Sequence, residues 1–332
     1  MNKKTKRIFS GASSALMIAS GAAQTALAET AYNVTAGESA AEYDKVANVE
    51  GRFSFNQNKL TPPDEVFNLF GTAVTGVCAR PDFALSSTKT DYYINVGGKI
   101  AYSYTVDLKE KAAQTRTMLC ACATGRATAN AEITGVKLAD VLELAEMGEG
   151  VNTIAVRSSD GYTSRLPLRY ALEKEAMIVY KIGGEALPGG TQLWVPETVA
   201  KYFTRDVVDI ELLAEEEEPQ VEQRDAALRA EVAVLNSVEG AVFPAGEEIT
   251  FEGYADDLGD PIAAVEFSLD GGETWTSYAT EKASANRWVY WHFAYTPKEA
   301  GNYCLAVRAR TAGGLVSPLE ADVTFAVADA KQ

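Results

Sequence analysis

Two cysteines placed two residues apart, Cys120 and Cys122, are the side chains in this sequence best suited to chemistry. The chain has four cysteines, and the other two, Cys78 and Cys304, lie far away along the sequence. A thiolate is both a nucleophile and a ligand for soft metals, and two thiols can form a disulfide. Four uses are therefore open: a disulfide, a metal site, a nucleophile, or small residues in a core.

Catalytic sets that pair cysteine or serine with histidine are disfavoured. The single histidine, His292, lies between Trp291 and Phe293 in an alternating aromatic stretch far from the cysteine pair. We expect a structural role for it there, because a Cys–His or Ser–His–Asp set would have to recruit it across domains.

The positions of the cysteines disfavour a zinc site and a disulfide between Cys120 and Cys122. Zinc sites draw on cysteine and histidine, so Cys78, Cys120 and Cys122 alone would make an unusual zinc site. A bond between Cys120 and Cys122 would close a strained small ring. A disulfide from Cys78 to either of them stays open in an exported protein, and we expect Cys304 to be a small core residue.

The N-terminus carries an export signal. A basic leader, MNKKTKR, precedes a Gly/Ala/Ser-rich apolar stretch that ends in Ala26-Leu27-Ala28, a small-x-small cleavage pattern. This pattern predicts a signal peptide over residues 1–28, cleaved after about Ala28, and a periplasmic or extracytoplasmic protein. TKRIFS resembles the twin-arginine export motif with Lys6 in place of its first arginine, and the general secretory route fits as well. No later stretch approaches the ~20 apolar residues of a membrane span.

The charge of the chain excludes one class of partner. The formal net charge is −16, and removal of residues 1–28 deletes four positive and no negative charges, which leaves −20. Phosphate backbones would repel so acidic a protein, so we expect no nucleic acid partner.

Patterning divides the mature chain into four parts. Residues 29–65 have little periodicity and indicate an extension, partly disordered or draped over a neighbour. Residues 66–213 mix helical and strand periods. Residues 214–229 contain four successive glutamates and Pro219, which indicate a solvated acidic linker. Residues 230–328 are dominated by short alternating strands with Gly/Pro turns, which predict an all-β sandwich.

Within residues 66–213 the spacing of apolar residues alternates between helical and strand patterns, which predicts an α+β domain with a mixed sheet. We expect hairpins at Gly97-Gly98, Asp160-Gly161 and Gly183-Gly184, and a short helix that opens near Pro167. Leu138, Val141, Leu142 and Ala145 fall at i, i+3, i+4 and i+7, which predicts a helix that ends near Gly148. No dinucleotide-binding glycine fingerprint or phosphate loop is present.

Several of these segments, taken in order over about Asp91 to Val327, resemble the sulfite-oxidase-like molybdopterin oxidoreductases. The resemblance rests on TMLCACATGR, ITGVKLADVLELA, SSDGYTSRLPL, VYKIGGEALPGGTQLWVPETV and, in the sandwich, VEFSLDGGETW with RWVYWHFAY. It implies an α+β mixed-sheet molybdopterin-binding domain over 66–213, followed by an immunoglobulin-like dimerisation domain over 230–328. ITGVKLADVLELA would be a helix after the cysteine loop.

The resemblance also implies a cofactor, molybdenum-molybdopterin, and the residues that serve it. Cys120 would be the metal ligand, with Cys122 as the alternative, because one thiolate suits a soft metal with open positions. Arg126 and Tyr162 would act at the substrate, and Asp160 and Arg205 would bind the cofactor. A plain hairpin turn would account for the presence of Asp160 and Tyr162 almost as well as a site role. Arg205 is equally well explained as a charged surface residue.

The implied function is two-electron oxygen-atom transfer at a Cys-ligated molybdenum. The family's Asn-x-His-x-Pro segment is missing, because no histidine precedes His292, so the substrate is open among sulfite, an S-oxide or N-oxide, and other small oxyanions. No haem motif is present, so we expect a separate electron carrier, and the resemblance implies a homodimer through the C-terminal domain. The alternative is a degenerate, non-catalytic relative that serves as an extracytoplasmic binding or assembly module.

Overall fold

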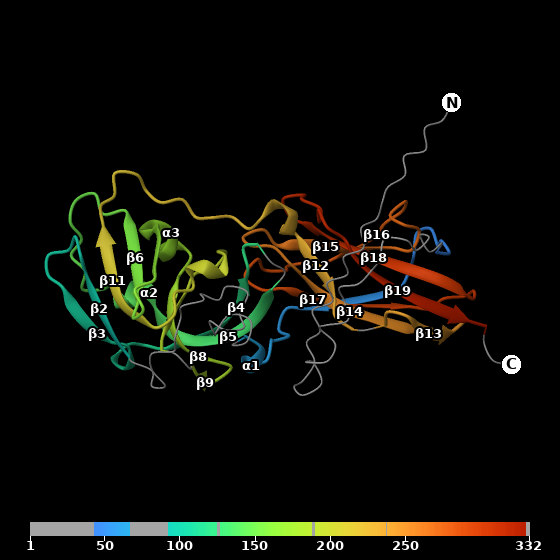
Figure 1. The fold of residues 1–332 in the computed structure, drawn as a ribbon, viewed down its shortest axis with the longest axis horizontal. Coiled ribbons are helices and arrows are strands. Elements are labelled where there is room, and N and C mark those ends of the chain that lie inside the picture. The colour runs from blue at the N-terminus through green and yellow to red at the C-terminus, as the bar shows by residue number, and fades with distance from the viewer. Residues whose placement is uncertain (1–42, 67–91, 125–126, 188–189, 237, 330–332) are drawn as a thin grey trace, which may run out of the picture.

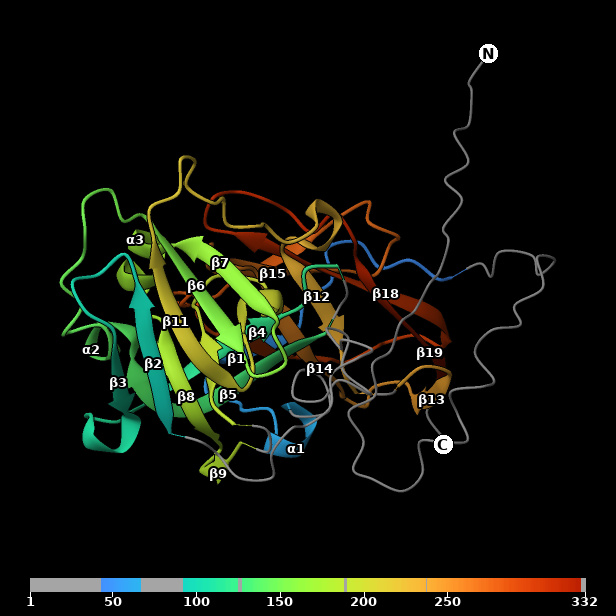
Figure 2. The same ribbon diagram turned by 60° about the vertical axis from the view of Figure 1, so that its left-hand side comes forward.

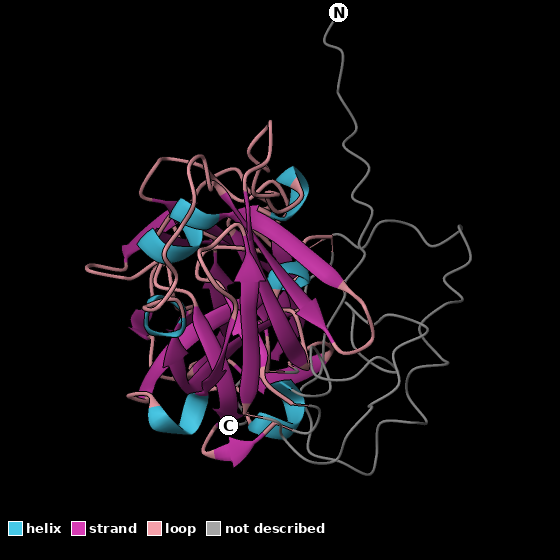
Figure 3. Ribbon diagram, turned by 90° about the vertical axis from the view of Figure 1, so that its left-hand side faces the viewer, coloured by secondary structure: helices cyan, strands magenta, loops and turns pink. Residues whose placement is uncertain are grey.

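The computed structural model describes residues 43–66, 92–124, 127–187, 190–236 and 238–329. Two β-rich units lie side by side in Figure 1, and residues 214–229 cross from the first to the second along the upper edge of that view. Strands dominate both units, and the described helices are short (Figure 3). The predicted signal peptide lies outside the described residues. No helix of the described part is both long and apolar enough to cross a membrane.

The first unit contains two sheets. Its elements are β2 (Tyr93–Gly98), β3 (Tyr104–Asp107), β4 (Gln114–Ala121), β5 (Thr128–Lys137), α2 (Leu138–Val141), β6 (Thr153–Ser158), β7 (Thr163–Pro167), α3 (Leu168–Glu173), β8 (Met177–Ile182), β9 (Glu185–Ala186), β10 (Gln192–Trp194) and β11 (Val207–Leu213). One sheet has the order β10-β8-β5-β4, with β9 beside β8, and the other has the order β3-β2-β11-β6-β7. The second sheet is mixed, because β11 runs parallel to β2 and antiparallel to β6.

Apolar residues from both sheets form the core of this unit. The buried set includes Ile94, Met118, Cys120, Ile133 and Ile210. The hairpins expected at 97–98, 160–161 and 183–184 are present. Glycines at 161, 183 and 184 have positive φ, which side-chain-bearing residues rarely adopt.

The helix expected after the cysteine loop is shorter than its sequence pattern indicates. Ile133 and Val136 belong to β5, and α2 covers only Leu138–Val141 before the chain turns at Leu142. The prediction that ITGVKLADVLELA forms a helix ending near Gly148 was therefore wrong at its C-terminal end, from Leu142 on, and over its first five residues, which belong to β5. Strand pairing explains the difference: β5 pairs with β8 up to Lys137, and a Cβ at Gly135 would meet the carbonyl of Ile178 at 2.1 Å.

The second unit is a two-sheet sandwich. Its strands are β12 (Glu231–Val234), β13 (Ala241–Pro244), β14 (Ile249–Asp256), β15 (Ile262–Ser268), β16 (Thr276–Ala279), β17 (Val289–Tyr295), β18 (Gly301–Thr311) and β19 (Ala321–Ala328). One sheet has the order β12-β14-β17 and the other β13-β19-β18-β15-β16. Phe251, Phe267, Trp291, Phe293 and Leu305 are buried between them. Residues 270–272 lie in the connection between the antiparallel strands β15 and β16.

The segment before the first unit is built into the second. Strand β1 (Arg52–Asn56) pairs antiparallel with β17 and extends that sheet to four strands, and helix α1 (Pro63–Val66) follows it. Figure 1 shows β1 in blue among the strands of the second unit, although its partner β17 follows more than two hundred residues later in sequence.

Cys304 and His292 both lie on outward faces of the sandwich sheets. Cys304 is half-buried, whereas its neighbours Tyr303 and Leu305 enter the core, so the expectation of a core cysteine was wrong. The imidazole of His292 is 41% exposed and lies 3.1 Å from a carboxylate oxygen of Glu252. His292 is therefore a surface residue of β17, remote in sequence from the cysteine pair.

Candidate functional site

The β4–β5 hairpin presents the cysteine pair. Cys120 lies opposite Ala129 in the hairpin, and the amide of Cys122 donates to the carbonyl of Ala127 at 2.8 Å, so pairing continues past the strand end. Cys120 is 0% exposed and Cys122 only 3% exposed. Within the described residues, Cys120, Cys122 and Cys304 form no disulfide. Cys78, the other partner considered for them, lies outside that part of the chain.

The environment of Cys120 is apolar. Its side chain belongs to the core between the two sheets, together with Met118 and Ala129. Burial raises the pKa of the Cys120 thiol well above its ordinary value of 9.0, and the nearby Cys122 raises it further. Without a cation the thiol is therefore protonated at neutral pH, and a soft metal ion is the kind of partner that would hold it as a thiolate.

A single segment, residues 190–206, lies against the strand end that carries the cysteines. Ala121 forms a parallel backbone bridge with Val199. Further along the same segment, Arg205 bridges to Gln192 and is 8% exposed, so its guanidinium is largely withdrawn from solvent. A buried arginine suits recognition of a phosphate group because its guanidinium can donate two parallel hydrogen bonds.

The turn that holds Asp160 and Tyr162 meets the same segment. The hydroxyl of Tyr162 donates to the carbonyl of Lys201 at 2.8 Å, and its amide donates to Oδ1 of Asp160 at 3.0 Å. Ser159 donates both its amide, at 3.0 Å, and its hydroxyl to Asp206. Asp160 is thus an exposed turn residue whose side chain caps the Tyr162 amide, while Tyr162 is tied to the segment beside Arg205.

The structure therefore gathers most of the predicted site residues around one segment. The β4 end brings Cys120 and Cys122, residues 190–206 bring Arg205, and the β6–β7 turn brings Tyr162. Arg126 lies outside the described residues. Asp160 lies on the β6–β7 turn, where its carboxylate accepts a hydrogen bond from the Tyr162 amide.

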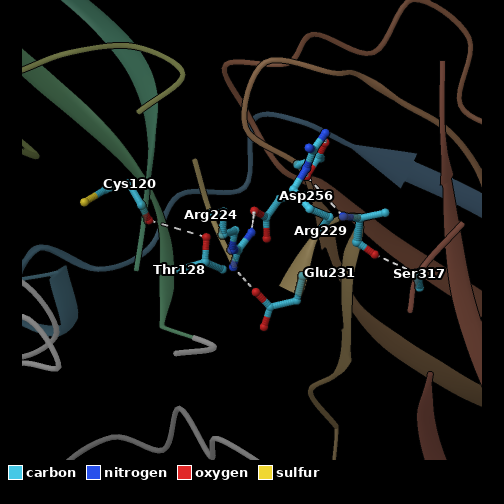
Figure 4. A network of polar contacts seen from close by, with 9 residues as sticks. Cys120, Thr128, Arg224, Arg229, Glu231, Asp256 and Ser317 are labelled. Carbon is cyan, nitrogen blue, oxygen red and sulfur yellow. Dashed lines mark hydrogen bonds and ion pairs between the residues drawn. The ribbon is translucent and has the colours of Figure 1, made fainter. Parts of the chain in front are cut away.

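A buried ion network beside the hairpin was missed by sequence reasoning. Arg224 falls in the predicted solvated linker, yet its side chain is 0% exposed and donates to Asp256 Oδ2 at 2.6 Å and to Glu231. Figure 4 shows this network next to Thr128, whose hydroxyl donates to the carbonyl of Cys120. Burial raises the pKa of Asp256, and this outweighs the lowering by Arg224. A lone arginine after a run of acidic residues was the only signal available.

A second missed residue is Asn130, which lies opposite Leu119 in the hairpin and is fully buried. Its side-chain amide donates to the carbonyls of Gln57 and Lys59 at 3.1 and 2.9 Å, and its backbone exchanges hydrogen bonds with Thr61. Residues 57–61, which we call the strap, thereby join the cysteine hairpin to the N-terminal segment.

The donor set fits a metal that needs only one protein ligand. Among the described residues, no group of three or more His, Cys, Asp or Glu side chains gathers as a metal cage. One buried soft donor, Cys120 or Cys122, and a buried arginine on the segment that meets the cysteine strand suit a metal carried on a phosphate-bearing organic cofactor.

Comparison with known proteins identifies the first unit. Residues 83–221 match the family model described as "Oxidoreductase molybdopterin binding domain". The chain is similar to the sulfane dehydrogenase SoxCD from Paracoccus pantotrophus, with a TM-score of 0.56 and 18% identity over 73% of this chain and 71% of that one. At that identity the similarity shows the fold alone.

Another similarity covers a smaller part of the chain. Fibronectin(III)-like modules of CbhA from Clostridium thermocellum match 30% of this chain and 99% of theirs, with 20% identity and a TM-score of 0.25. That score is too low to support an argument, and no curated protein sequence matches the chain. Residues 83–221 thus match the model of a molybdopterin-binding oxidoreductase domain.

Proposed function

We propose that this chain is an exported molybdopterin-dependent oxidoreductase that transfers an oxygen atom in a two-electron reaction at a molybdenum held by Cys120. The observation that carries the proposal is the position of this thiol. It is fully buried in the β4–β5 hairpin of the molybdopterin-binding domain, and the strand end beside it contacts the segment that leads to Arg205.

Each residue near the thiol has a distinct part in the proposal. The bound cofactor would supply the two-electron oxygen-atom chemistry. Cys120 would hold the metal as a thiolate, with Cys122 as the alternative ligand. Arg205 would bind the anionic end of the cofactor, with the Asp160 turn close to it.

Two residues would serve the substrate. Arg126, which follows the cysteine pair in sequence, would attract an oxyanion by its charge. Tyr162, whose hydroxyl donates to the carbonyl of Lys201, would orient the substrate. The substrate class is a small oxyanion or an S-oxide or N-oxide. Because SoxCD is a sulfane dehydrogenase, sulfur compounds come first in a screen.

The remaining parts of the proposal concern the whole protein. The signal peptide would direct export, and a separate carrier would exchange electrons with the metal. The second unit, as an immunoglobulin-like sandwich, would form a homodimer. Size measurement of the purified mature protein tests the last point, and a monomer would contradict it.

The test is cofactor analysis of protein produced with its own signal in a host supplied with molybdate. We expect near-stoichiometric molybdenum by elemental analysis, and pterin fluorescence after denaturation, in the exported fraction. Cys304→Ser is the matched control, since Cys304 is a cysteine of the second unit, and it should keep both. Protein free of metal and pterin, despite correct folding, would contradict the enzyme and favour the non-catalytic alternative.

A further inference from the structure

The strap, residues 57–61, is hydrogen-bonded both to the cysteine hairpin and to the second unit. The carbonyl of Lys59 accepts one hydrogen bond from the side-chain amide of Asn130 in the hairpin, at 2.9 Å, and one from the indole Nε1 of Trp288 in the second unit, at 2.8 Å. Asn130 and Trp288 are both buried. One backbone carbonyl of the strap therefore joins the two units.

Gln57, at the start of the strap, contacts the same two parts of the molecule. Its side chain donates to the carbonyls of Ser284 and Arg287, both at 3.0 Å, and accepts from the amide of Ser284 at 2.8 Å. Its backbone carbonyl accepts from the side chain of Asn130 at 3.1 Å. The side chain of Gln57 thus binds the loop before β17, while its backbone binds the cysteine hairpin.

These contacts reach the residue directly before Cys120. Asn130 lies opposite Leu119 in the pairing of β4 with β5. The amide of Leu119 donates to the carbonyl of Asn286, in the loop before β17, at 2.8 Å, and its side chain packs with Trp288. Leu119 is therefore held by the second unit directly and, through its strand partner Asn130, by the strap.

The segment that contains the strap runs from one unit to the other. Strand β1 pairs with β17 in the second unit, and helix α1 packs beside β5 of the first. Figure 1 shows both elements in blue, with the strap as the short stretch that connects them. The strap lies outside residues 83–221, which match the molybdopterin-binding family model, so the matched domain does not contain these contacts.

We propose that the strap positions the strand end that carries Cys120, with Gln57 and Asn130 as positioning residues, an inference that rests on the proposed role of Cys120 as metal ligand. Both residues act through the backbone of the hairpin rather than on the thiol. A metal ligand must be held within a fraction of an ångström, and hydrogen bonds beyond the ligand itself do this. The N-terminal segment is then part of the framework of the metal site.

The test is the rate at which iodoacetamide alkylates Cys120 in the mature, full-length, metal-free protein with Cys122→Ser, followed by peptide mass spectrometry. Because Cys120 is fully buried, it reacts only when the hairpin opens. Gln57→Ala removes the side-chain hydrogen bonds to the loop and keeps the carbonyl that Asn130 uses, and we expect about fivefold faster alkylation. Arg52→Ala is the control on the same segment, since that side chain is 78% exposed and pairs with Glu248, and it should keep the parent rate.

A double-mutant cycle between Gln57→Ala and Asn130→Ala tests whether the strap carries the contact from the loop to the hairpin. The first substitution frees the strap from the second unit, and the second frees it from the hairpin. The fivefold effect of Gln57→Ala should therefore fall below about twofold when Asn130 is already alanine. Thr61→Val, which removes the acceptor of the Asn130 amide, replaces Asn130→Ala if that variant does not fold.

The outcomes separate the inference from the proposed function. An unchanged rate in Gln57→Ala, or independent effects of the two substitutions, would overturn the positioning role even if molybdenum is present. So would alkylation rates that follow the free energy of unfolding, measured in urea, across all variants. A coupled effect with Arg52→Ala at the parent rate supports the role. If that pattern occurs while every preparation lacks molybdenum, the strap holds the cysteine hairpin, but its role at a metal site is overturned along with the proposed function.

Discussion

The backbone of Ala121 forms a parallel bridge with that of Val199, so the strand end between the two cysteines lies against the segment that leads to Arg205. This contact joins a soft metal donor and a buried cation across almost eighty residues of sequence. Figure 2 shows the hairpin formed by β4 and β5 extending from the first unit toward β12 of the second. The site thus depends on contacts from three parts of the chain.

Arg205→Ala should lower cofactor content. A buried arginine that donates charge-assisted hydrogen bonds to a phosphate contributes about 1.5–3 kcal/mol, so retention of the pterin should fall about tenfold or more. Pterin fluorescence of denatured protein measures this, with circular dichroism to verify the fold. Arg169→Ala is the control, since that side chain is 77% exposed on α3. Full pterin content in Arg205→Ala would remove this residue from the cofactor site.

Asn130→Ala should destabilise the protein and release the strap. The substitution leaves the carbonyls of Gln57 and Lys59 without the donor they share, at a cost of about 2–4 kcal/mol. Urea unfolding gives the change in free energy, and limited proteolysis should cut near residues 57–61 sooner. Asn95→Ala, on an exposed sheet face, should cost less than about 1 kcal/mol. Similar losses for both variants would contradict the proposed strength of the strap.

Arg224→Met should be among the most destabilising single substitutions. It leaves Glu231 and Asp256 buried without their common partner, which costs about 3–5 kcal/mol. The triple replacement Arg224→Met, Glu231→Leu, Asp256→Leu removes all three charges and should recover most of that loss. Chemical unfolding of both variants gives the two free energies of unfolding to be compared. A triple variant no more stable than Arg224→Met would show that the ion network itself stabilises the fold.

Stability should decline in alkaline solution partly because of Cys304. Burial, with smaller effects from Asp322 and Glu239, raises the pKa of this thiol from 9.0 to about 12. The unfolded chain therefore loses the proton first, so the stability contributed by the group is complete below about pH 9 and is lost as pH rises toward about 12.

The measurement is urea unfolding of metal-free protein at about pH 8 and about pH 11. Parent protein should lose stability from this group by at most about 1.4 kcal/mol per pH unit, and Cys304→Ala should show a smaller decline. An unchanged slope in Cys304→Ala would assign the alkaline loss to other groups, such as Tyr170 and Tyr290, whose pKa values burial also raises to about 12.

The turns and the strands beside them could be predicted because they depend on a few residues that are adjacent in sequence. Glycines with positive φ at 161, 183 and 184 mark turns, and alternation on either side of them marks the paired strands.

Features that depend on distant partners could not be predicted in the same way. The period through Leu138, Val141 and Leu142 is helical, yet pairing of β5 with β8 takes the preceding residues into a strand. Arg224 reads as part of a solvated acidic stretch, because Asp256 and Glu231 come only later in the chain. Strand β1 becomes part of a sheet only through β17.

The most direct test of the central claim is X-ray absorption at the molybdenum edge, on parent protein and on the Cys120→Ser and Cys122→Ser variants. The account predicts one fewer sulfur neighbour around molybdenum in Cys120→Ser, and an unchanged sulfur count in Cys122→Ser. An unchanged count in Cys120→Ser would contradict Cys120 as the ligand, and a loss confined to Cys122→Ser would assign the metal to the second cysteine of the pair.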